Sequence, residues 1–149
     1  MIPEKLRKFM EVEKADYEII SQNDRVIHSS KQMAKAVIVR AGVKPYMVVI
    51  PACYELDLKK LADFLDVSSV SVEAEQDFSK FFPDCDSGIV PALGRLYNVP
   101  CLIDETMLDG PSVIFQVGRD GEFFKISSYE YWRVAQAEEI GDFRIHSLK

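Results

Sequence analysis

The sequence predicts an α+β protein with a mixed β-sheet. Two observations carry this prediction. Two pairs of apolar runs are each joined by a short turn, which is typical of β-hairpins, and segments with helical spacing of apolar residues alternate with these hairpins. Such an alternation favours an α+β fold. No internal repeat or low-complexity tract divides the 149 residues, so we expect a single domain that spans residues 1–149.

The first third of the chain is expected to contain one helix, one separate strand and one hairpin. Pro3 suits the first turn of a helix. Apolar residues then recur at helical spacing at Leu6, Phe9 and Met10. Short apolar runs between polar or glycine-containing turns predict the other elements. In chain order these are a strand at 17–20, a turn at 21–24, a strand at 36–40, a turn at 42–45 and a strand at 46–50.

The rest of the chain is expected to alternate in the same way. Pro51 ends the second hairpin strand, and Asp57 is placed to cap an amphipathic helix. Ser127 or Ser128 is placed to cap a last amphipathic helix. The other predicted elements are a strand at 70–73, a helix at 78–82 that ends at Pro83, a loop at 84–88, a strand at 101–103, and hairpin strands at 113–117 and 123–126 around a turn at 119–121.

Composition and charge limit the class of protein. Hydrophobic residues make up 48% of the chain, which excludes a disordered protein, and the longest apolar runs are far too short to span a bilayer. We expect no secretion signal, and three cysteines without a CxxC pair indicate reduced cytosolic thiols. The net charge of −6 excludes a protein that coats nucleic acid through its phosphates, although a local basic patch could contact one briefly.

Lys35 is the first candidate functional residue. It precedes the apolar run 36–39, and because side chains alternate along a strand it shares a face with Val37 and Val39. Both faces of the run are apolar, which predicts a strand covered on two sides. A lysine at its start either extends to water or directs its cation into a pocket, where a low dielectric strengthens its attraction for a carbonyl or phosphate. The pattern alone leaves both alternatives open.

The second candidate is the segment 88–94, which contains two glycines and a proline. Gly88 permits a positive φ or the close approach of a ligand, and Pro91 stiffens the turn. Such a loop can direct backbone N–H groups at an anion or a developing oxyanion. Composition alone does not distinguish it from an ordinary loop between a helix and a strand.

Other residues of reactive types are expected to have structural roles. Cys85 could attack an ester as a thiolate, but burial as a small apolar residue is the commoner role, and Cys53 and Cys101 are expected in the core. His28 is expected in a cap or turn, and His146 in a frayed tail.

Three larger sets have two interpretations each. Four acidic residues could form a metal site but lack the ligand spacing of a calcium loop, so we expect solvated loops at Asp84, Asp86, Asp104 and Glu105. Five basic residues either form a rim for an acceptor stem or are scattered: Arg40, Lys44, Arg95, Arg119 and Lys125. Five aromatic residues are expected in the core rather than in a base-stacking platform: Phe123, Phe124, Tyr129, Tyr131 and Trp132.

Two motifs resemble those of the YbaK/EbsC-type aminoacyl-tRNA deacylases, a family that includes the editing domain of bacterial prolyl-tRNA synthetases. Residues 33–39, MAKAVIV, are similar to the family's lysine strand. Residues 81–100, FFPDCDSGIVPALGRLYNVP, followed by Asp104, are similar to its FPDC–GxxPxxG–LY–P signature. Gly118, Ile126 and Glu130-Tyr131 give a weaker match, and the resemblance covers most of the chain, from about residue 17 to 132.

This resemblance implies a partly curled mixed sheet surrounded by helices, and an enzyme that hydrolyses the ester between a wrong amino acid and the 3′ end of a tRNA. It implies that Lys35 is the essential lysine and that the Gly88 backbone helps to hold the aminoacyl group. The remaining substrate-binding residues would be Ile89, Val90, Pro91, Gly94 and Glu130, the last of which stands where aspartate is usual.

Two departures from the family bear on the substrate more than on the fold. Family members usually have a longer helical stretch before the lysine strand, where this chain has only residues 25–34. A histidine often follows the glycine of the last hairpin, where this chain has Arg119.

We therefore expect a cytoplasmic trans-editing hydrolase that removes a small amino acid, such as alanine or cysteine, from mischarged tRNA, with proline tRNA as the carrier that the family suggests. It is expected to need no metal or organic cofactor, to contact aminoacyl-tRNA transiently, and to bind neither DNA nor membranes. Two alternatives stay open. One is a non-catalytic module that holds an aminoacyl-tRNA end, a nucleotide or a partner in the same pocket, and the other is a thioesterase that uses Cys85.

Overall fold

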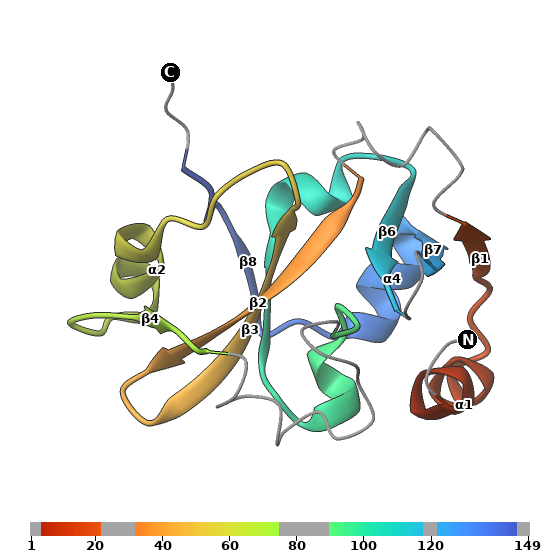
Figure 1. The fold of residues 1–149 in the computed structure, drawn as a ribbon, viewed down its shortest axis with the longest axis horizontal. Coiled ribbons are helices and arrows are strands. Elements are labelled where there is room, and N and C mark those ends of the chain that lie inside the picture. Colours follow the sequence, from red (N-terminus) through yellow and green to blue (C-terminus); the bar gives the residue numbers. More distant parts are fainter. Residues whose placement is uncertain (1–3, 22–31, 75–89, 118–121, 146–149) are drawn as a thin grey trace.

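The computed structural model describes residues 4–21, 32–74, 90–117 and 122–145. Their strands form two β-sheets, and their helices pack around these sheets (Figure 1). The helical elements are α1 (Glu4–Glu13), α2 (Leu58–Leu65), η3 (Gly94–Tyr97), η4 (Glu105–Leu108) and α4 (Ser128–Ala135), of which η3 and η4 are 3₁₀ helices. The strands are β1 (Glu18–Ser21), β2 (Ala34–Ala41), β3 (Lys44–Pro51), β4 (Ser71–Val72), β5 (Cys101–Asp104), β6 (Ser112–Gln116), β7 (Glu122–Ser127) and β8 (Glu139–Gly141). The predicted helix at 78–82 lies outside the described residues.

The strands are divided between two sheets. A five-stranded sheet has the order β4-β2-β3-β5-β8, in which β2 pairs antiparallel with β3 and β4, whereas β5 pairs parallel with β3 and β8. A three-stranded antiparallel sheet has the order β1-β7-β6. The predicted α+β class with a mixed sheet is confirmed. The second sheet forms because the β6–β7 hairpin pairs with β1 and not with the β2–β3 hairpin.

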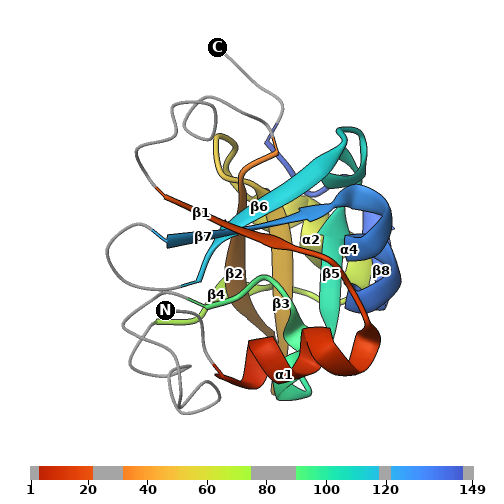
Figure 2. The ribbon, with the colours of Figure 1, turned by 90° about the vertical axis from the view of Figure 1, so that its right-hand side faces the viewer.

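The five-stranded sheet is covered on both faces, as the apolar run of β2 predicted. Ala34 and Ile38 of this strand contribute to one apolar cluster, and Val39 and Ala41 contribute to another. The first cluster also contains side chains of α1, α4 and the three-stranded sheet, and the second contains side chains of α2. Figure 2 shows β1, β7 and β6 crossing one face of the β2–β3 hairpin, with α2 on the far side.

Predicted capping residues determine where two helices begin. The Asp57 carboxylate accepts a hydrogen bond of 3.1 Å from the Lys60 backbone N–H at the start of α2. Of the two candidate serines, Ser127 caps α4, and its hydroxyl oxygen accepts a 3.1 Å hydrogen bond from the Glu130 N–H. Every helix in the described part of the chain is too short or too polar to cross a bilayer.

The strand β8 was not predicted from the sequence. It contains a single strongly apolar residue, Ile140, between Glu139 and Gly141, so no alternating pattern marks it. It is a strand because it pairs with the edge of β5, where Leu102 lies opposite Glu139. Tertiary pairing, rather than local preference, therefore determines this element.

Asp104 is buried, so the prediction of a solvated loop is wrong for this residue. Its side chain has 0% exposure at the end of β5. One carboxylate oxygen accepts a hydrogen bond from the Thr106 N–H at 2.9 Å, and the other accepts from the Phe143 N–H at 2.8 Å and from Arg144 Nε at 3.2 Å. These donors compensate for the lost hydration, and they attach the segment after β8 to β5.

Two further predictions of burial are wrong in part. Cys53 is exposed in the turn after β3, whereas Cys101 is buried as predicted. On α4, Tyr129 and Trp132 are 71% and 46% exposed, while Tyr131 is fully buried. The helix is amphipathic and faces the core with one side only, so positions 129 and 132, three residues apart, both lie on its outer side.

Candidate functional site

Lys35 lines a cavity of about 270 Å³ between the two sheets. The lining comes from the start of β2, the turn after β3, the residue before the buried Pro91, and the strands β6 and β7: Met33, Ala34, Lys35, Ala36, Ala52, Val90, Phe115, Gln116 and Phe123. Lys35 is half-buried, and with the residues that the structure describes it forms no hydrogen bond or ion pair. Of the two alternatives for Lys35, this position favours a cation at a pocket.

A single backbone bridge explains why a cavity exists at this place. Met33 and Ile114 form an isolated parallel bridge between the two sheets. The Ile114 N–H also donates a hydrogen bond of 2.9 Å to the Gln32 carbonyl oxygen. β2, which begins directly after Met33, belongs to the five-stranded sheet, whereas β6, which contains Ile114, belongs to the three-stranded sheet. The two strands therefore diverge, and the cavity lies in the space between them.

The segment that follows Val90 is anchored in the core. Val90 lines the cavity, and Pro91 and Ala92 are buried next to it. The Tyr131 hydroxyl donates a hydrogen bond of 2.6 Å to the Ala92 carbonyl oxygen. The structure thus brings Lys35 and Val90 to the same cavity. The other two predicted residues of this loop, Gly88 and Ile89, lie outside the described residues.

Gly94 lies behind the cavity wall and is not among the described residues that line the cavity. It is buried at the start of η3, where a Cβ atom would overlap the Val99 carbonyl oxygen. The Val99 N–H in turn donates a hydrogen bond of 3.0 Å to the Gly94 carbonyl oxygen. This close approach of two backbone segments explains a glycine here without any contact to substrate.

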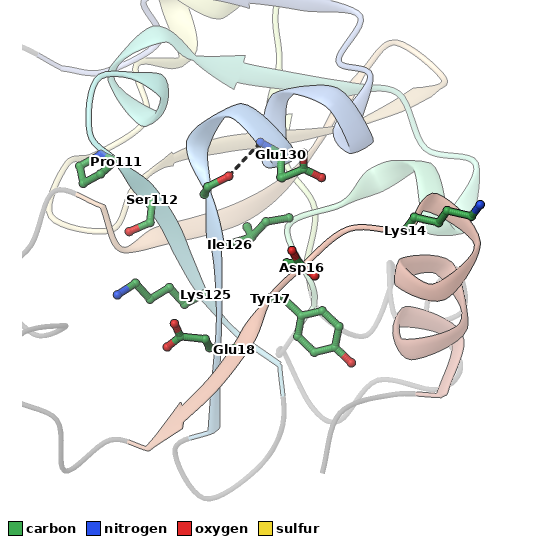
Figure 3. Close-up of a pocket in the computed structure, with 10 residues that line it drawn as sticks. Lys14, Asp16, Tyr17, Glu18, Pro111, Ser112, Lys125, Ile126 and Glu130 are labelled. Carbon is green, nitrogen blue, oxygen red and sulfur yellow. Dashed lines mark hydrogen bonds between the residues drawn. The ribbon is translucent and has the colours of Figure 1, made fainter.

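Glu130 lines a different cavity, of about 520 Å³, between the start of β1, the end of β7 and the start of α4 (Figure 3). Its carboxylate forms an ion pair of 2.6 Å with Arg133. The same guanidinium donates a hydrogen bond of 3.0 Å to the carbonyl oxygen of Glu13, the last residue of α1. In the structure, Glu130 therefore connects α4 to the end of α1.

The two cavities lie at opposite ends of the β6–β7 ladder. Ser112 pairs with Ser127 at the end that belongs to the Glu130 cavity, and Gln116 pairs with Phe123 at the end that belongs to the Lys35 cavity. The two ends are four positions apart along each strand, a distance of about 13 Å. The structure therefore does not bring Glu130 and Lys35 together.

Tyr131, the neighbour of Glu130, is buried in the core, as the sequence predicted. Replacing it with phenylalanine is expected to lower the free energy of unfolding by about 1–3 kcal/mol, because the buried Ala92 carbonyl loses its hydrogen-bond donor. Urea denaturation measures this loss. Tyr129→Phe is the matched control, since Tyr129 is exposed on the same helix, and an equal loss in both variants would contradict the prediction.

The buried thiol has an abnormal titration. Burial raises the pKa of Cys101 to about 12 from 9.0, against a smaller opposing effect of a backbone hydrogen bond at Gly94. Burial also raises the pKa of Tyr131 well above 10.0, and the nearby Cys101 adds to that increase. Both groups stay protonated in the folded protein when the unfolded chain has already released their protons. Cys101 is therefore an inert thiol at neutral pH.

Stability is expected to fall as the pH rises from 9 toward 12, because the unfolded chain binds fewer protons than the folded protein in this range. The measurement is the free energy of unfolding in urea at pH 8 and at about pH 10.5. Cys101→Ala is expected to reduce this pH dependence, whereas the exposed-site control Cys53→Ala leaves it unchanged. The same pH dependence in the wild type and in Cys101→Ala would refute the assignment.

The predicted basic residues that the structure describes do not form one surface around the Lys35 cavity. Arg40 is paired with Glu73 at 2.5 Å, and Arg95 is paired with Glu13 at 3.1 Å. Lys125 lines the Glu130 cavity. Two of the cations are therefore already neutralised by carboxylates, which favours the scattered arrangement among the described residues.

Within the described ranges, no group of three or more His, Cys, Asp or Glu side chains is arranged to hold a metal ion. Several candidates from the sequence lie outside those ranges: His28, Asp84, Cys85, Asp86, Arg119 and His146.

Comparison with known proteins places this fold among editing domains. The model of the aminoacyl-tRNA editing domain family matches residues 16–134. No curated protein matches the sequence. A proposed trans-editing enzyme for prolyl tRNA synthetase is similar in structure, with a TM-score of 0.78 and 15% identity over 96% of each chain.

Two other solved structures are similar to the chain at the same level. A hypothetical protein has a TM-score of 0.80 and 16% identity, over 95% of this chain and 99% of its own. A structure from work on epitope backbone grafting onto scaffold proteins has a TM-score of 0.82 and 16% identity over 97% of each chain. At these identities the structural similarities show the fold alone.

Proposed function

This chain belongs to the aminoacyl-tRNA editing domain family, and from that premise we propose that it is a trans-editing deacylase which uses the Lys35 cavity as its active site. The reaction is the hydrolysis of the ester between a wrongly attached amino acid and the 3′ end of a tRNA. One observation carries the assignment of the site: Lys35 and Val90, which come from the two motifs of the sequence, line the same cavity.

The cavity offers what ester hydrolysis requires. An aminoacyl ester is already activated, so the reaction needs a positioned water molecule and stabilisation of the negative charge that develops on the carbonyl oxygen. In this proposal, the Lys35 ammonium attracts that oxygen, and the low dielectric of the apolar lining strengthens the attraction. Water adds to the carbonyl carbon, the bond to the ribose oxygen breaks, and the amino acid and the tRNA hydroxyl are released.

The loop residues complete the proposed site. Gly88 is proposed to contribute a backbone N–H to the oxyanion, and Ile89, Val90 and Pro91 to form the wall beside it. Gly94 and Glu130 would act indirectly, through the backbone segments that they support. The buried hydrogen bond from Tyr131 to the Ala92 carbonyl supports a fixed position for this wall.

The lining also supports a small, uncharged amino acid as the group removed. Besides Lys35, the lining contains three alanines, at positions 34, 36 and 52, together with Val90 and two phenylalanines. An apolar wall disfavours a charged side chain because it offers no compensation for lost hydration. Alanine and cysteine are therefore the first candidates. The similarity to a proposed trans-editing enzyme for prolyl tRNA synthetase makes proline tRNA the first carrier to test.

The decisive experiment is a panel of tRNAs, each carrying a correct or a wrong amino acid, incubated with the pure protein. Release of alanine or cysteine at a rate well above spontaneous hydrolysis is the expected result. Saturable binding of these tRNAs without release would instead identify the protein as a binding module. Hydrolysis that depends on Cys85, shown by loss of activity in Cys85→Ser, would identify a thiol-based esterase.

A further inference from the structure

We propose that Gln116 recognises the α-amino group of the substrate, so that the site prefers aminoacyl esters over acyl esters that lack this group. The inference rests on the proposed function, because it concerns the same cavity and the same ester. It assigns Gln116 as a specificity-determining residue and the protonated α-amino group as its ligand.

The Met33–Ile114 bridge explains why Gln116 and Lys35 line the same cavity. Lys35 lies two residues beyond Met33, and Gln116 lies two residues beyond Ile114, in the same direction because the bridge is parallel. Side chains two residues apart lie on the same side of a strand. The Lys35 side chain therefore lies on the same side as that of Met33, and the Gln116 side chain lies on the same side as that of Ile114. Met33 and Ile114 share one apolar cluster with Phe123, and Phe123 lines the cavity. The two polar side chains therefore emerge toward the same cavity.

The other described residues of the lining are apolar, so the polar parts of a bound ester have two side chains to contact. Lys35 attracts the carbonyl oxygen and repels a second cation in this low-dielectric space. The pKa of an α-amino group is about 7.7–8.0, so this group is mostly protonated and positively charged at neutral pH. It is therefore expected to lie away from Lys35, against a neutral acceptor. The Gln116 amide carbonyl is such an acceptor at the rim of the cavity.

An existing interaction of Gln116 within the protein does not conflict with this role. A glutamine amide has two donor hydrogens and an oxygen with two lone pairs. One hydrogen bond within the protein therefore leaves hydrogen-bonding capacity for a substrate. An internal bond would also hold the amide in place and reduce the conformational entropy lost when the substrate binds. The Gln116 side chain is exposed at the rim, where an amino group can reach it when the tRNA end enters.

The experiment compares two esters that differ only in the amino group: alanyl-tRNA and propionyl-tRNA. Gln116→Leu is expected to lower kcat/KM for alanyl-tRNA about tenfold or more, as expected for the loss of a hydrogen bond to a charged group, and to leave kcat/KM for propionyl-tRNA within about twofold. The ratio of the two values is the readout. Gln116→Met, with an unbranched stem, gives the same comparison where the leucine variant does not fold.

Three results would overturn the inference. An equal loss of kcat/KM for both esters would assign Gln116 a structural role, and wild-type kcat/KM values for both esters would show that other residues recognise the amino group. In both cases the wild-type protein still hydrolyses alanyl-tRNA, so the proposed function stands. If the wild type hydrolyses neither ester nor any aminoacyl-tRNA of the panel, the proposed function fails and the inference fails with it.

Discussion

Replacing Lys35 with alanine is expected to lower the rate of deacylation by about 100- to 1000-fold while the protein stays folded. This is the usual cost of removing one group that stabilises an oxyanion. The loss should lie mainly in kcat, because the ammonium attracts the charge that develops in the transition state more than the neutral ester. Single-turnover hydrolysis of the substrate found in the tRNA panel measures it.

A second lysine provides a matched control for this variant. Lys59 is exposed on α2, it is not among the described residues that line the Lys35 cavity, and it has no ion pair with the described residues. Lys59→Ala is expected to keep the wild-type rate, and both variants should unfold at similar urea concentrations. Full activity in Lys35→Ala would reject the assignment of the active site.

Replacing Asp104 with alanine is expected to lower the free energy of unfolding by about 3–5 kcal/mol, the typical result of removing one partner of a buried ion pair. The Arg144 side chain is only 12% exposed, and its Nε lies 3.1 Å from the Asp104 carboxylate. Burial alone would lower the pKa of the guanidinium, but the carboxylates of Asp104 and Asp142 raise it above the usual value of arginine. Without Asp104, the Arg144 guanidinium loses the nearer of these two carboxylates, and the Phe143 N–H loses its acceptor.

Urea denaturation of Asp104→Ala measures this loss, with Asp63→Ala as the control. Asp63 is exposed on α2, and its replacement is expected to change stability by no more than about 0.5 kcal/mol. The variant Arg144→Met separates the two parts of the effect, because it leaves the carboxylate with its two backbone donors. A loss below about 1 kcal/mol in Asp104→Ala would contradict the importance of this pair.

The sequence predicted those elements whose local pattern and tertiary surroundings agree. The β2–β3 hairpin combines two apolar runs with a glycine turn, and the Asp57 cap precedes a helix with one apolar face. Asp104 and β8 were missed for the same reason. Two of the hydrogen bonds that compensate the buried Asp104 carboxylate come from Phe143 and Arg144, about 40 positions along the chain. No local spacing in the sequence reveals these distant donors.

The site shows the same limit. The motif residues Lys35 and Val90 were chosen from the sequence, and they line one cavity. Gln116 was not chosen, because a single glutamine at the end of a strand carries no signal by itself. Its position follows from the bridge between Met33 and Ile114, which joins segments about 80 residues apart. The signal that points to Gln116 is the apolar run of β6, which can pair in parallel with the segment before the lysine strand.

The bridge between the sheets has a consequence for how substrate preference could change during evolution. The cavity opens where two strands part, so its width depends on the angle between two separately twisted sheets as much as on the side chains that face it. A substitution elsewhere in either sheet that changes the angle between the sheets would change the size of the acyl group that fits, without any change in the residues that line the cavity. If the proposed function holds, a change in the angle between the sheets would alter which acyl group fits while Lys35 keeps its position.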